Sequence, residues 1–304
     1  MPVSPCVVGV GRALRYSPNS ADRDAAALQA VATCLEARGC RVMLVGEEDF
    51  TTSVTRKADA VFSMARSREA LALFESLSLP IINPPVGLRN ARRSVLTDCF
   101  AKYAVPMPPT WTVQGADDLP EPTFPCWLKR ADACAQSADD VCYVENQAQL
   151  RREWAKFQKK GIKEAIVCKH VAGDLLKFYG VEGSGFFYFY YPTADGGFSK
   201  FGLERHNGKA HKYAFDTTRL TAEAERASRL LHLPVYGGDC IVEPDGSFYF
   251  IDFNDWPSFS CCREAASAAI AARVLRAIEH NESFRNYEQQ PGSDIQVAGY
   301  GRMA

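Results

Sequence analysis

The sequence lacks any long apolar run. None reaches the roughly 18–20 residues that a membrane-spanning helix needs, because Arg, Glu or Lys interrupts each stretch. Its start also lacks a basic segment followed by an apolar core, so we expect no signal peptide. The formal net charge of −1 gives no excess of positive charge for neutralising phosphates in bulk. These absences favour a soluble, cytoplasmic protein with neither nucleic acid nor membrane as partner.

Cysteine pairs with the C-x-x-C spacing of zinc sites are also missing. The 11 cysteines are odd in number and scattered, and the even spacing of Cys126, Cys134 and Cys142 fits no zinc pattern. Reduced thiols in a cytosolic protein explain this usage better than a disulfide framework does. The apolar content of 47% and the length of 304 residues allow two or three packed units with a large core.

The first part of the chain alternates short apolar runs with helical patterns. Strands are expected at residues 6–11, 41–46, 58–64 and 79–83, and helices at residues 21–38 and 67–79. This alternation predicts an α/β unit with a parallel sheet and right-handed crossovers.

After Pro84-Pro85 the pattern changes. We expect helices at residues 90–105, 147–161, 221–233 and 263–280, and strands at 124–130, 141–146, 164–171, 174–183 and 185–192. Residues 237–254 have the pattern of a hairpin. The last two dozen residues, rich in Asn, Gln and Gly, are expected to form a loosely held tail.

The run SFYFIDFNDWPSF (247–259) contains two Asp residues and one Asn in a strand rich in aromatic residues. Asp252, Asn254 and Asp255 lie there, although Asp and Asn are depleted from strands and a buried carboxylate is costly without a partner. The Asp245-Gly246 pair between two β-rich runs predicts a hairpin turn.

A turn centred on that pair fixes the register of the hairpin. Ile241 would face Phe250, Asp239 would face Asp252, and Asn254 would point to the same side as Asp252. Like charges directly opposite destabilise a sheet, so this geometry needs a cation, and oxygen ligands favour Mg²⁺. A three-residue turn would shift the register and remove the argument.

The alternative is that Asp239 and Asp252 lie at a solvated sheet edge. Asp255 faces the other side by strand alternation, so it is not part of the predicted cluster. Lys129 and Lys177, each within an apolar strand, could direct their ammonium groups into a cleft, although surface positions are also consistent with the pattern. Lysines and Mg²⁺ together would suit phosphoryl transfer, which depends on fixed positive charge around the phosphates.

The order of these elements resembles the ATP-grasp superfamily over residues 82–271. The strongest similarity is between residues 237–259 and its metal-binding hairpin, in which an acidic residue precedes an acid-x-Asn-x-x-Pro run. The resemblance implies a Rossmann-like α/β pre-ATP-grasp domain at residues 1–84, a lid lobe at 85–166 and a C-terminal lobe at 167–304. The two lobes would be α+β, with ATP held between them.

The resemblance also implies roles for individual residues. The Mg²⁺ ligands would be Asp239, Asp252 and Asn254. The nucleotide would contact Lys129 through its α- and β-phosphates, and a hinge through its adenine and ribose: Cys168, Lys169, His170, Val171 and Asp174. Two basic residues would lie near the γ-phosphate or the substrate: Lys177 and Arg205.

The loop after Lys129 departs from the superfamily pattern. It reads RADACAQSADD (130–140) and has no Gly, whereas glycines normally let backbone amides close over the phosphates. Its Ala-Asp-x-x-Ala-x-Ser lettering is similar to that of inositol trisphosphate 5/6-kinases, with Ala138 where those kinases carry a His. Contact with the nucleotide is expected from Ser137 or Gln136 instead.

The resemblance leaves three functions open. The first is an ADP-forming ligase that activates a carboxylate as an acyl phosphate, as RimK-like carboxylate–amine ligases do. The second is a kinase that phosphorylates a polyol hydroxyl. The third is a nucleotide-binding module without catalysis. The substrate would be an amino acid, a peptide or a phosphorylated polyol, and a polyanion could use these arginines: Arg12, Arg15, Arg66, Arg68, Arg89, Arg92 and Arg93.

Two other features have no assigned chemistry. His206, His211 and His232 show no metal-ligand or triad pattern and are expected to be structural or surface residues. The adjacent Cys261 and Cys262 follow the hairpin at the predicted start of a helix, where a reactive thiol is conceivable, but buried inert thiols are more usual.

Overall fold

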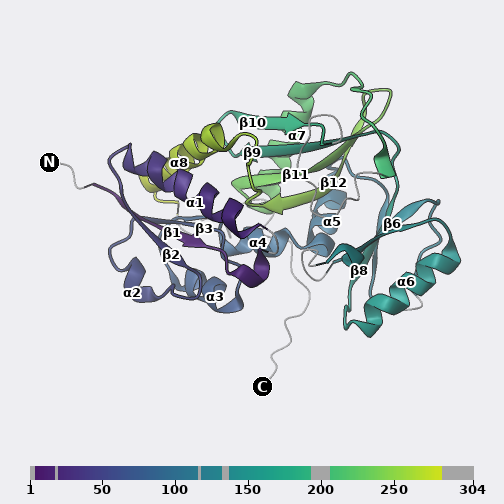
Figure 1. Cartoon of the computed structure of the whole chain (residues 1–304), viewed down its shortest axis with the longest axis horizontal. Helices are drawn as coiled ribbons and strands as arrows, with labels where there is room; N and C mark the ends of the chain where they lie inside the picture. The colour runs from purple at the N-terminus through teal and green to yellow at the C-terminus, as the bar shows by residue number, and fades with distance from the viewer. Residues whose placement is uncertain (1–3, 18–19, 116–117, 132–136, 193–205, 283–304) are drawn as a thin grey trace.

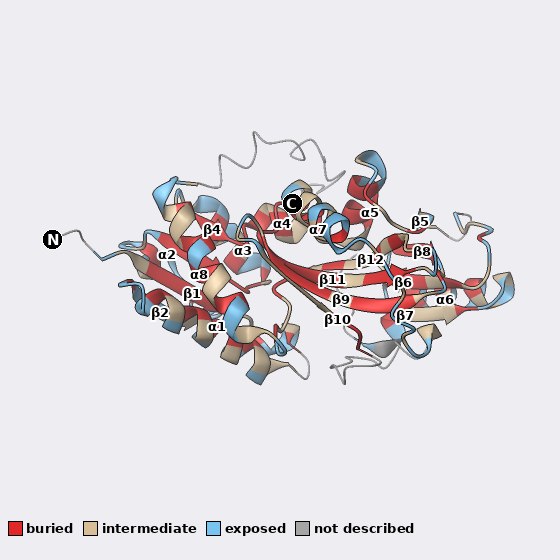
Figure 2. Ribbon diagram, turned by 90° about the horizontal axis from the view of Figure 1, so that it is seen from above, coloured by how far each residue is buried: buried red, intermediate tan, exposed pale blue. Residues whose placement is uncertain are grey.

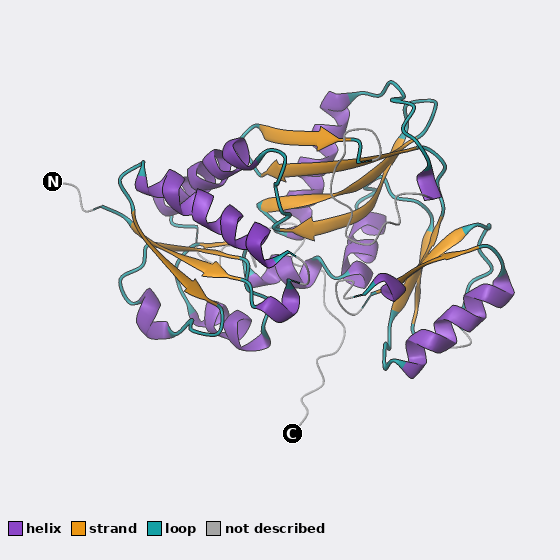
Figure 3. Ribbon diagram, in the orientation of Figure 1, coloured by secondary structure: helices purple, strands orange, loops and turns teal. Residues whose placement is uncertain are grey.

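The structure is a computed structural model that describes residues 4–17, 20–115, 118–131, 137–192 and 206–282. It contains three four-stranded sheets with helices packed against them (Figures 1 and 3). Within these ranges, no helix combines the length and the apolar character needed to span a bilayer. Most of residues 281–304, the expected tail, lie outside the described ranges.

The N-terminal sheet has the strand order β2-β1-β3-β4 and is parallel throughout, as predicted. Its strands are β1 (Cys6–Gly11), β2 (Arg41–Gly46), β3 (Ala60–Ser63) and β4 (Ile81–Ile82). Apolar residues of β1 and β3 pack on both faces of the sheet, which is why the strands read as continuous apolar runs. The helices of this unit are α1 (Ala21–Glu36), α2 (Thr52–Thr55) and α3 (Arg68–Ser76), with a 3₁₀ turn at Leu14–Tyr16.

The second sheet lies largely within the predicted lid lobe and is called the lid sheet below. It is antiparallel, with the order β5-β8-β6-β7. Its strands are β5 (Thr110–Val113), β6 (Cys126–Arg130), β7 (Val141–Val144) and β8 (Ala165–Lys169), and a 3₁₀ turn at Ala138–Asp140 precedes β7. Helix α6 (Gln147–Lys159) covers one face through Leu150, Trp154 and Phe157. Strand β8 extends across the expected division at 166/167, and all of it pairs within this sheet.

The C-terminal sheet has the order β10-β9-β11-β12 and is also antiparallel. Its strands are β9 (Asp174–Val181), β10 (Phe186–Tyr190), β11 (Val235–Val242) and β12 (Phe248–Asp255). Residues of α5 (Arg93–Lys102) and α7 (Thr217–Leu231) pack on one face, and α4 (Pro85–Asn90) precedes α5. Strands β9 and β11 are largely buried (Figure 2).

The other face of the C-terminal sheet is only partly covered. Helix α8 (Arg263–Glu279) lies beside α1 and joins the core shared by the N-terminal unit and the start of β11 (Figure 1). Ile241 and Ile251 of the C-terminal sheet line a recess together with Trp127 and Lys129 of the lid sheet. Helix α7 begins one turn earlier than predicted, because the Asp216 side chain accepts the Arg219 N–H and caps it there.

The end of α7 leads to a testable pH dependence. His232 follows the helix with φ of +55° and is 3% exposed, and burial lowers the pKa of its imidazole. As the pH falls, the imidazole is protonated in the unfolded chain before it is protonated in the folded protein. The free energy of unfolding therefore decreases as the pH falls below about 6.5. We expect urea unfolding of His232→Asn to depend less on pH between 7 and 5.5 than that of the wild type, since Asn tolerates a left-handed backbone. Equal pH slopes would contradict a titrating His232.

Candidate functional site

The turn of the β11–β12 hairpin is one residue longer than predicted. The Glu243 N–H donates to the Ser247 carbonyl oxygen at 2.9 Å, which leaves three residues in the loop. The register beyond the loop is therefore shifted. Ile241 faces Tyr249, so the predicted pairing of Ile241 with Phe250 is wrong.

A β-bulge then restores the alignment of the two carboxylates. In the shifted register Asp239 would face Ile251, but the pairing slips between Asp239 and Cys240. Cys240 consequently faces Phe250, and Asp239 faces Asp252. A bulge adds one residue to one strand, which here compensates for the longer turn. The prediction that Asp239 and Asp252 lie directly opposite is confirmed.

A row of polar side chains crosses the C-terminal sheet at this level. Tyr190, Lys177, Asp239 and Asp252 occupy paired positions on the four strands. Lys177 Nζ lies 2.9 Å from Asp239 Oδ1, and the Asp239 and Asp252 side chains are 27% and 21% exposed. Asn254 lies two residues beyond Asp252 and hydrogen-bonds to it through its side chain. The three predicted metal ligands are thus brought together on one face.

Arg93 balances the second carboxylate, a contact that the sequence did not indicate. Its Nη2 lies 3.1 Å from Asp252 Oδ2, and its Nη1 donates to the Arg130 carbonyl oxygen at 3.0 Å. Burial alone would raise the pKa of Asp252, but the charges of Arg93 and Lys129 outweigh it and lower that pKa. One signal was present: Arg93 begins α5, where the helix dipole disfavours a cation unless an acid lies nearby.

Lys129 makes a second contact between the lid and β12. On β6, Cys126 and Leu128 face the core under α6, so Lys129 points to the opposite side. The residue is 6% exposed, and its Nζ donates to the carbonyl oxygen of Ile251, next to the bulge, at 2.8 Å. Lys129 and Arg93 therefore hold the lid against the strand that carries Asp252.

A narrow recess with a volume of about 10 Å³ lies between the lid sheet and the C-terminal sheet. Five of the predicted nucleotide residues line it: Lys129, Cys168, Lys169, His170 and Val171. The other lining residues are Trp127, Asn207, Ile241 and Ile251. The recess is smaller than the roughly 300–1,000 Å³ of ordinary ligand sites, so a nucleotide would enter only after the walls move apart.

The hinge offers fewer free backbone groups than the sequence suggested. The Lys169 N–H donates to the Pro109 carbonyl oxygen at 2.9 Å, and the His170 N–H donates to that of Pro125 at 3.1 Å. These two amides hold the hinge in place and are not available to a base. The Val171 carbonyl oxygen also has a partner, since it accepts Asn207 Nδ2 at 3.4 Å.

Asp174, for which a ribose contact was predicted, has partners within the protein. Its carboxylate is 1% exposed and accepts the His211 N–H at 2.7 Å and the Tyr213 N–H at 2.9 Å. Buried carboxylates need such donors. Asp174 therefore anchors residues 211–213 to the start of β9 and is not among the residues that line the recess.

The loop after β6 is described only from Ser137 onward. The Ser137 N–H and Oγ both donate to the Asp140 carboxylate at 3.2 Å, and Asp140 is 2% exposed. Ser137 thus caps a local turn beside the lid sheet. Gln136 and Arg205, for which nucleotide and phosphate contacts were predicted, lie outside the described residues.

The arginines expected to bind a polyanion are mostly paired within the protein. Five of the seven contact acidic side chains: Arg12 with Asp24 and Asp255, Arg15 with Glu48, Arg66 with Asp255, Arg89 with Glu75, and Arg93 with Asp252. A polyanionic substrate would have to displace these carboxylates. The described residues therefore give no support to a preformed polyanion pocket.

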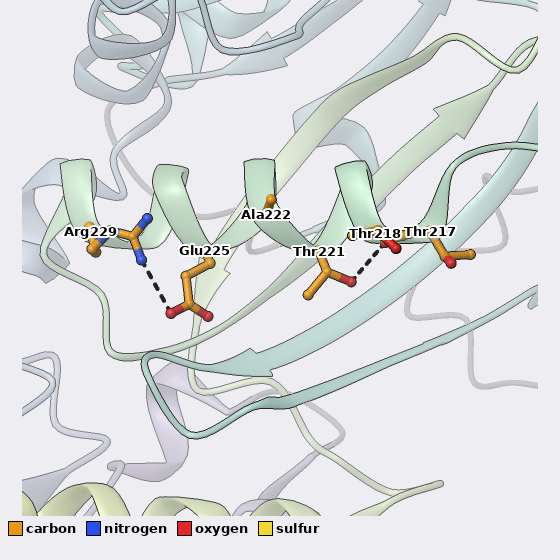
Figure 4. A pocket seen from close by; sticks show the side chains of 6 residues that line it. All are labelled: Thr217, Thr218, Thr221, Ala222, Glu225 and Arg229. Atoms are coloured by element: carbon orange, nitrogen blue, oxygen red, sulfur yellow. Dashed lines mark hydrogen bonds and ion pairs between the residues drawn. The ribbon is translucent and has the colours of Figure 1, made fainter.

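A second pocket lies on the outer side of α7 and is separate from this site (Figure 4). Thr217, Thr221, Glu225 and Arg229 are among its lining residues, and the Thr221 hydroxyl and the Arg229 guanidinium bond within the helix. The inner side of α7 packs on the sheet face opposite the polar row. This shallow pocket shows no arrangement of groups that suggests catalysis.

The donor set at the hairpin fits a hard cation. In the described part of the chain, no cluster of three or more His, Cys, Asp or Glu side chains could hold a metal. The predicted set differs in composition, with two carboxylates and one amide, and two basic side chains balance its charge. Oxygen donors of this kind suit Mg²⁺, which retains water and phosphate ligands. The described cysteines are free, and burial followed by the neighbouring Cys261 raises the pKa of Cys262 to about 12, which makes its thiol inert.

Comparison with known proteins identifies the fold. No protein-family model matches the sequence, and no curated protein matches it. Among solved structures, the chain is similar to a RimK domain ATP-grasp protein from Sphaerobacter thermophilus DSM 20745, with 20% identity, a TM-score of 0.62, and coverage of 88% of this chain and 99% of that chain.

Two further similar structures belong to a D-alanine–D-alanine ligase from Bacillus anthracis. The one complexed with ATP has 10% identity and a TM-score of 0.64, and the match covers 92% of this chain and 99% of that chain. The other has 11% identity and a TM-score of 0.63, with coverage of 94% and 99%. The chain therefore has the ATP-grasp fold, as its hairpin motif and element order predicted.

Proposed function

We propose that this chain is a Mg²⁺-dependent, ADP-forming ligase that joins a carboxylate to an amine or a thiol through an acyl phosphate. The observation that carries the proposal is the polar row on the C-terminal sheet, with Lys177, Asp239 and Asp252 in register and Asn254 beside them. The row lies next to a recess lined by Lys129 and the hinge. This combination provides fixed positive charge and oxygen ligands where phosphates would meet a metal.

Each group has a specific part in this proposal. Asp239, Asp252 and Asn254 would hold Mg²⁺, which when bound neutralises charge on the phosphates. Lys129 would exchange the Ile251 carbonyl oxygen for a phosphate oxygen, because a charged acceptor is the stronger partner. Lys177 would offset the charge that develops on the transferred group, while the lid excludes water.

The proposed reaction has two steps. A substrate carboxylate oxygen attacks the γ-phosphorus, the bond from that phosphorus to the bridging oxygen breaks, and ADP leaves. An amine or thiol next attacks the acyl carbon and displaces inorganic phosphate, while one proton is lost from the nucleophile. Bringing the reactants together in a closed site supplies much of the acceleration.

The ligase is favoured over the polyol kinase by the paired arginines described above. A carboxylate needs only one bidentate Arg, whereas an inositol phosphate needs several free cations. One similar structure is titled a RimK domain ATP-grasp protein and two are titled ligases, which adds support. An amino acid or peptide is therefore the proposed substrate, without nucleic acid or membrane as partner. The free thiols favour the reducing cytoplasm.

An ADP-release screen tests the proposal directly. Purified protein with Mg²⁺ and ATP would be offered amino acids, dipeptides and inositol phosphates, each with and without hydroxylamine. We expect ADP release with an amino acid or dipeptide, and a hydroxamate when hydroxylamine traps the acyl phosphate. A phosphorylated polyol as product would establish the kinase instead. ADP release with none of these would leave a nucleotide-binding module.

Lys177→Met is expected to lower the rate of ADP release by about 10²-fold, because it removes a cation fixed beside the transferred phosphate. Asp239 loses its partner at the same time, so urea unfolding is measured alongside to establish that the variant is folded in the assay. Lys163→Met, at an exposed position in the lid lobe, is the matched control and should leave the rate unchanged. An unaltered rate in Lys177→Met would show that its ammonium group does not act on the phosphate.

A further inference from the structure

Four rings form a cluster at the edge of the nucleotide recess. The His206 ring stacks on Tyr143 of β7, with 4.3 Å between ring centroids and 21° between planes. The same His206 ring meets the edge of Trp127 of β6 at 5.3 Å and 89°. Trp127 Nε1 donates to His170 Nδ1 at 3.1 Å, which joins the hinge to the cluster.

The cluster links two lobes and borders the recess. Tyr143 and Trp127 belong to the lid sheet, whereas His206 belongs to the segment between β10 and α7 of the C-terminal lobe. Asn207, the next residue, donates through Nδ2 to the Val171 carbonyl oxygen at 3.4 Å and lines the recess with Trp127. Asn207 therefore lies at one side of the recess and binds one carbonyl of the hinge, and His206 directly precedes it.

The geometry of the His206–Tyr143 contact is that of a base on an aromatic side chain. Imidazole is a planar nitrogen heterocycle, and parallel stacking on a phenol ring is the arrangement that proteins use to bind nucleobases. The Tyr143 and His206 side chains are both only half-buried, so this stack is not part of the hydrophobic core. A stack across two lobes must also separate whenever the lobes part to admit a ligand.

We propose that Tyr143 provides the stacking face for the base of the bound nucleotide, and that His206 occupies this face as an internal competitor in the nucleotide-free protein. The inference rests on the nucleotide binding proposed above and adds two residues to it. The recess of about 10 Å³ is too small for a nucleotide while Asn207 lines it and His206, the preceding residue, stays stacked on Tyr143. Withdrawal of the imidazole joins the recess to the space over Tyr143.

This arrangement fixes the sign of two opposite effects. An internal competitor lowers the apparent affinity by the fraction of molecules in which the face is open. Removing the His206 ring should therefore tighten nucleotide binding, whereas removing the Tyr143 ring should weaken it. A purely structural cluster would weaken binding, or leave it unchanged, on either substitution.

The test is isothermal titration of the full-length protein with Mg²⁺-ADP. We expect His206→Ala to lower the Kd about threefold to tenfold, the range of one aromatic stack, and Tyr143→Ala to raise it at least about fivefold. Tyr143→Phe, which keeps the ring, should match the wild type. Lys209→Ala, at an exposed position near His206, is the control for the segment and should also match it.

Tryptophan emission checks the stack without any ligand. His206 contacts Trp127, whereas Trp154 and Trp256 are buried elsewhere and Trp111 is exposed, so His206→Ala should change the emission component that Trp127→Phe removes. Weaker or unchanged Mg²⁺-ADP binding by His206→Ala, or unchanged binding by Tyr143→Ala, would overturn this inference alone. Failure of both the wild type and His206→Ala to bind Mg²⁺-ADP would reject the proposed function as well.

Discussion

Asp252→Asn is expected to lower Mg²⁺-dependent ADP release at least about 10³-fold, because it removes a charged oxygen ligand from the centre of the polar row. The neutral amide would no longer balance Arg93, which lies 3.1 Å away, nor hold a cation together with Asp239. Arg93 loses its charged partner, so some loss of unfolding free energy is also expected, and urea unfolding establishes that the variant is folded in the assay. Steady-state ADP release at saturating ATP, over a range of Mg²⁺ concentrations, measures the effect.

Asp245→Asn is the matched control, since it makes the same substitution in the exposed turn of the same hairpin. It should retain the wild-type rate. A wild-type rate in Asp252→Asn would show that Asp252 serves only to balance Arg93. If Asp252→Asn loses activity but high Mg²⁺ restores it, the carboxylate contributes to metal affinity and not to the chemical step.

The register of the β11–β12 hairpin could be predicted only in part. The predicted pairing of Asp239 with Asp252 is correct, although the predicted two-residue turn is not. A turn signal in the sequence identifies where a hairpin reverses, but a bulge depends on contacts from other elements. Here the Phe250 N–H donates to the Pro106 carbonyl oxygen and Lys129 bonds Ile251, and both partners lie more than a hundred residues away. The longer turn and the bulge compensate for each other.

Elements with strong periodicity could be predicted, whereas contacts between lobes could not. The parallel order of the first sheet follows from the alternation of strands and helices, and β1 and β2 have the predicted bounds. The local sequence around Arg93 and His206 does not identify their partners, which lie on distant elements and come close only when the lobes pack together. The partners of Asp174 could not be predicted either, because a motif position does not reveal which backbone amides a carboxylate accepts.

Asp255 lies in the same motif as Asp252 and Asn254, but strand alternation places its side chain on the other face of β12, where it makes structural contacts. It lies three residues after Asp252 and points to the opposite face, where it is 3% exposed and contacts Arg66 and Arg12. Arg12 Nη1 also lies 3.2 Å from Asp24 Oδ2. These contacts connect the end of the β11–β12 hairpin to residues that follow the carboxyl ends of β1 and β3. We call these ion pairs of Asp255 with Arg12 and Arg66 the anchor. The anchor fixes the strand that carries Asp252 and Asn254 on its other face.

Asp255→Ala is therefore expected to cost about 3–5 kcal/mol of unfolding free energy, because it leaves two largely buried guanidinium groups without their common carboxylate. Urea unfolding followed by circular dichroism measures the loss, and Asp255→Asn keeps the test possible if the Ala variant does not fold.

Asp139→Ala is the control: it removes an exposed ion pair with Lys160 and should cost less than about 1 kcal/mol. Adding Arg66→Met to Asp255→Ala should recover part of the loss, since one uncompensated charge disappears. A cost for Asp255→Ala no larger than that of Asp139→Ala would contradict the anchor and would leave the hairpin to be positioned by the lid contacts of Arg93 and Lys129 alone.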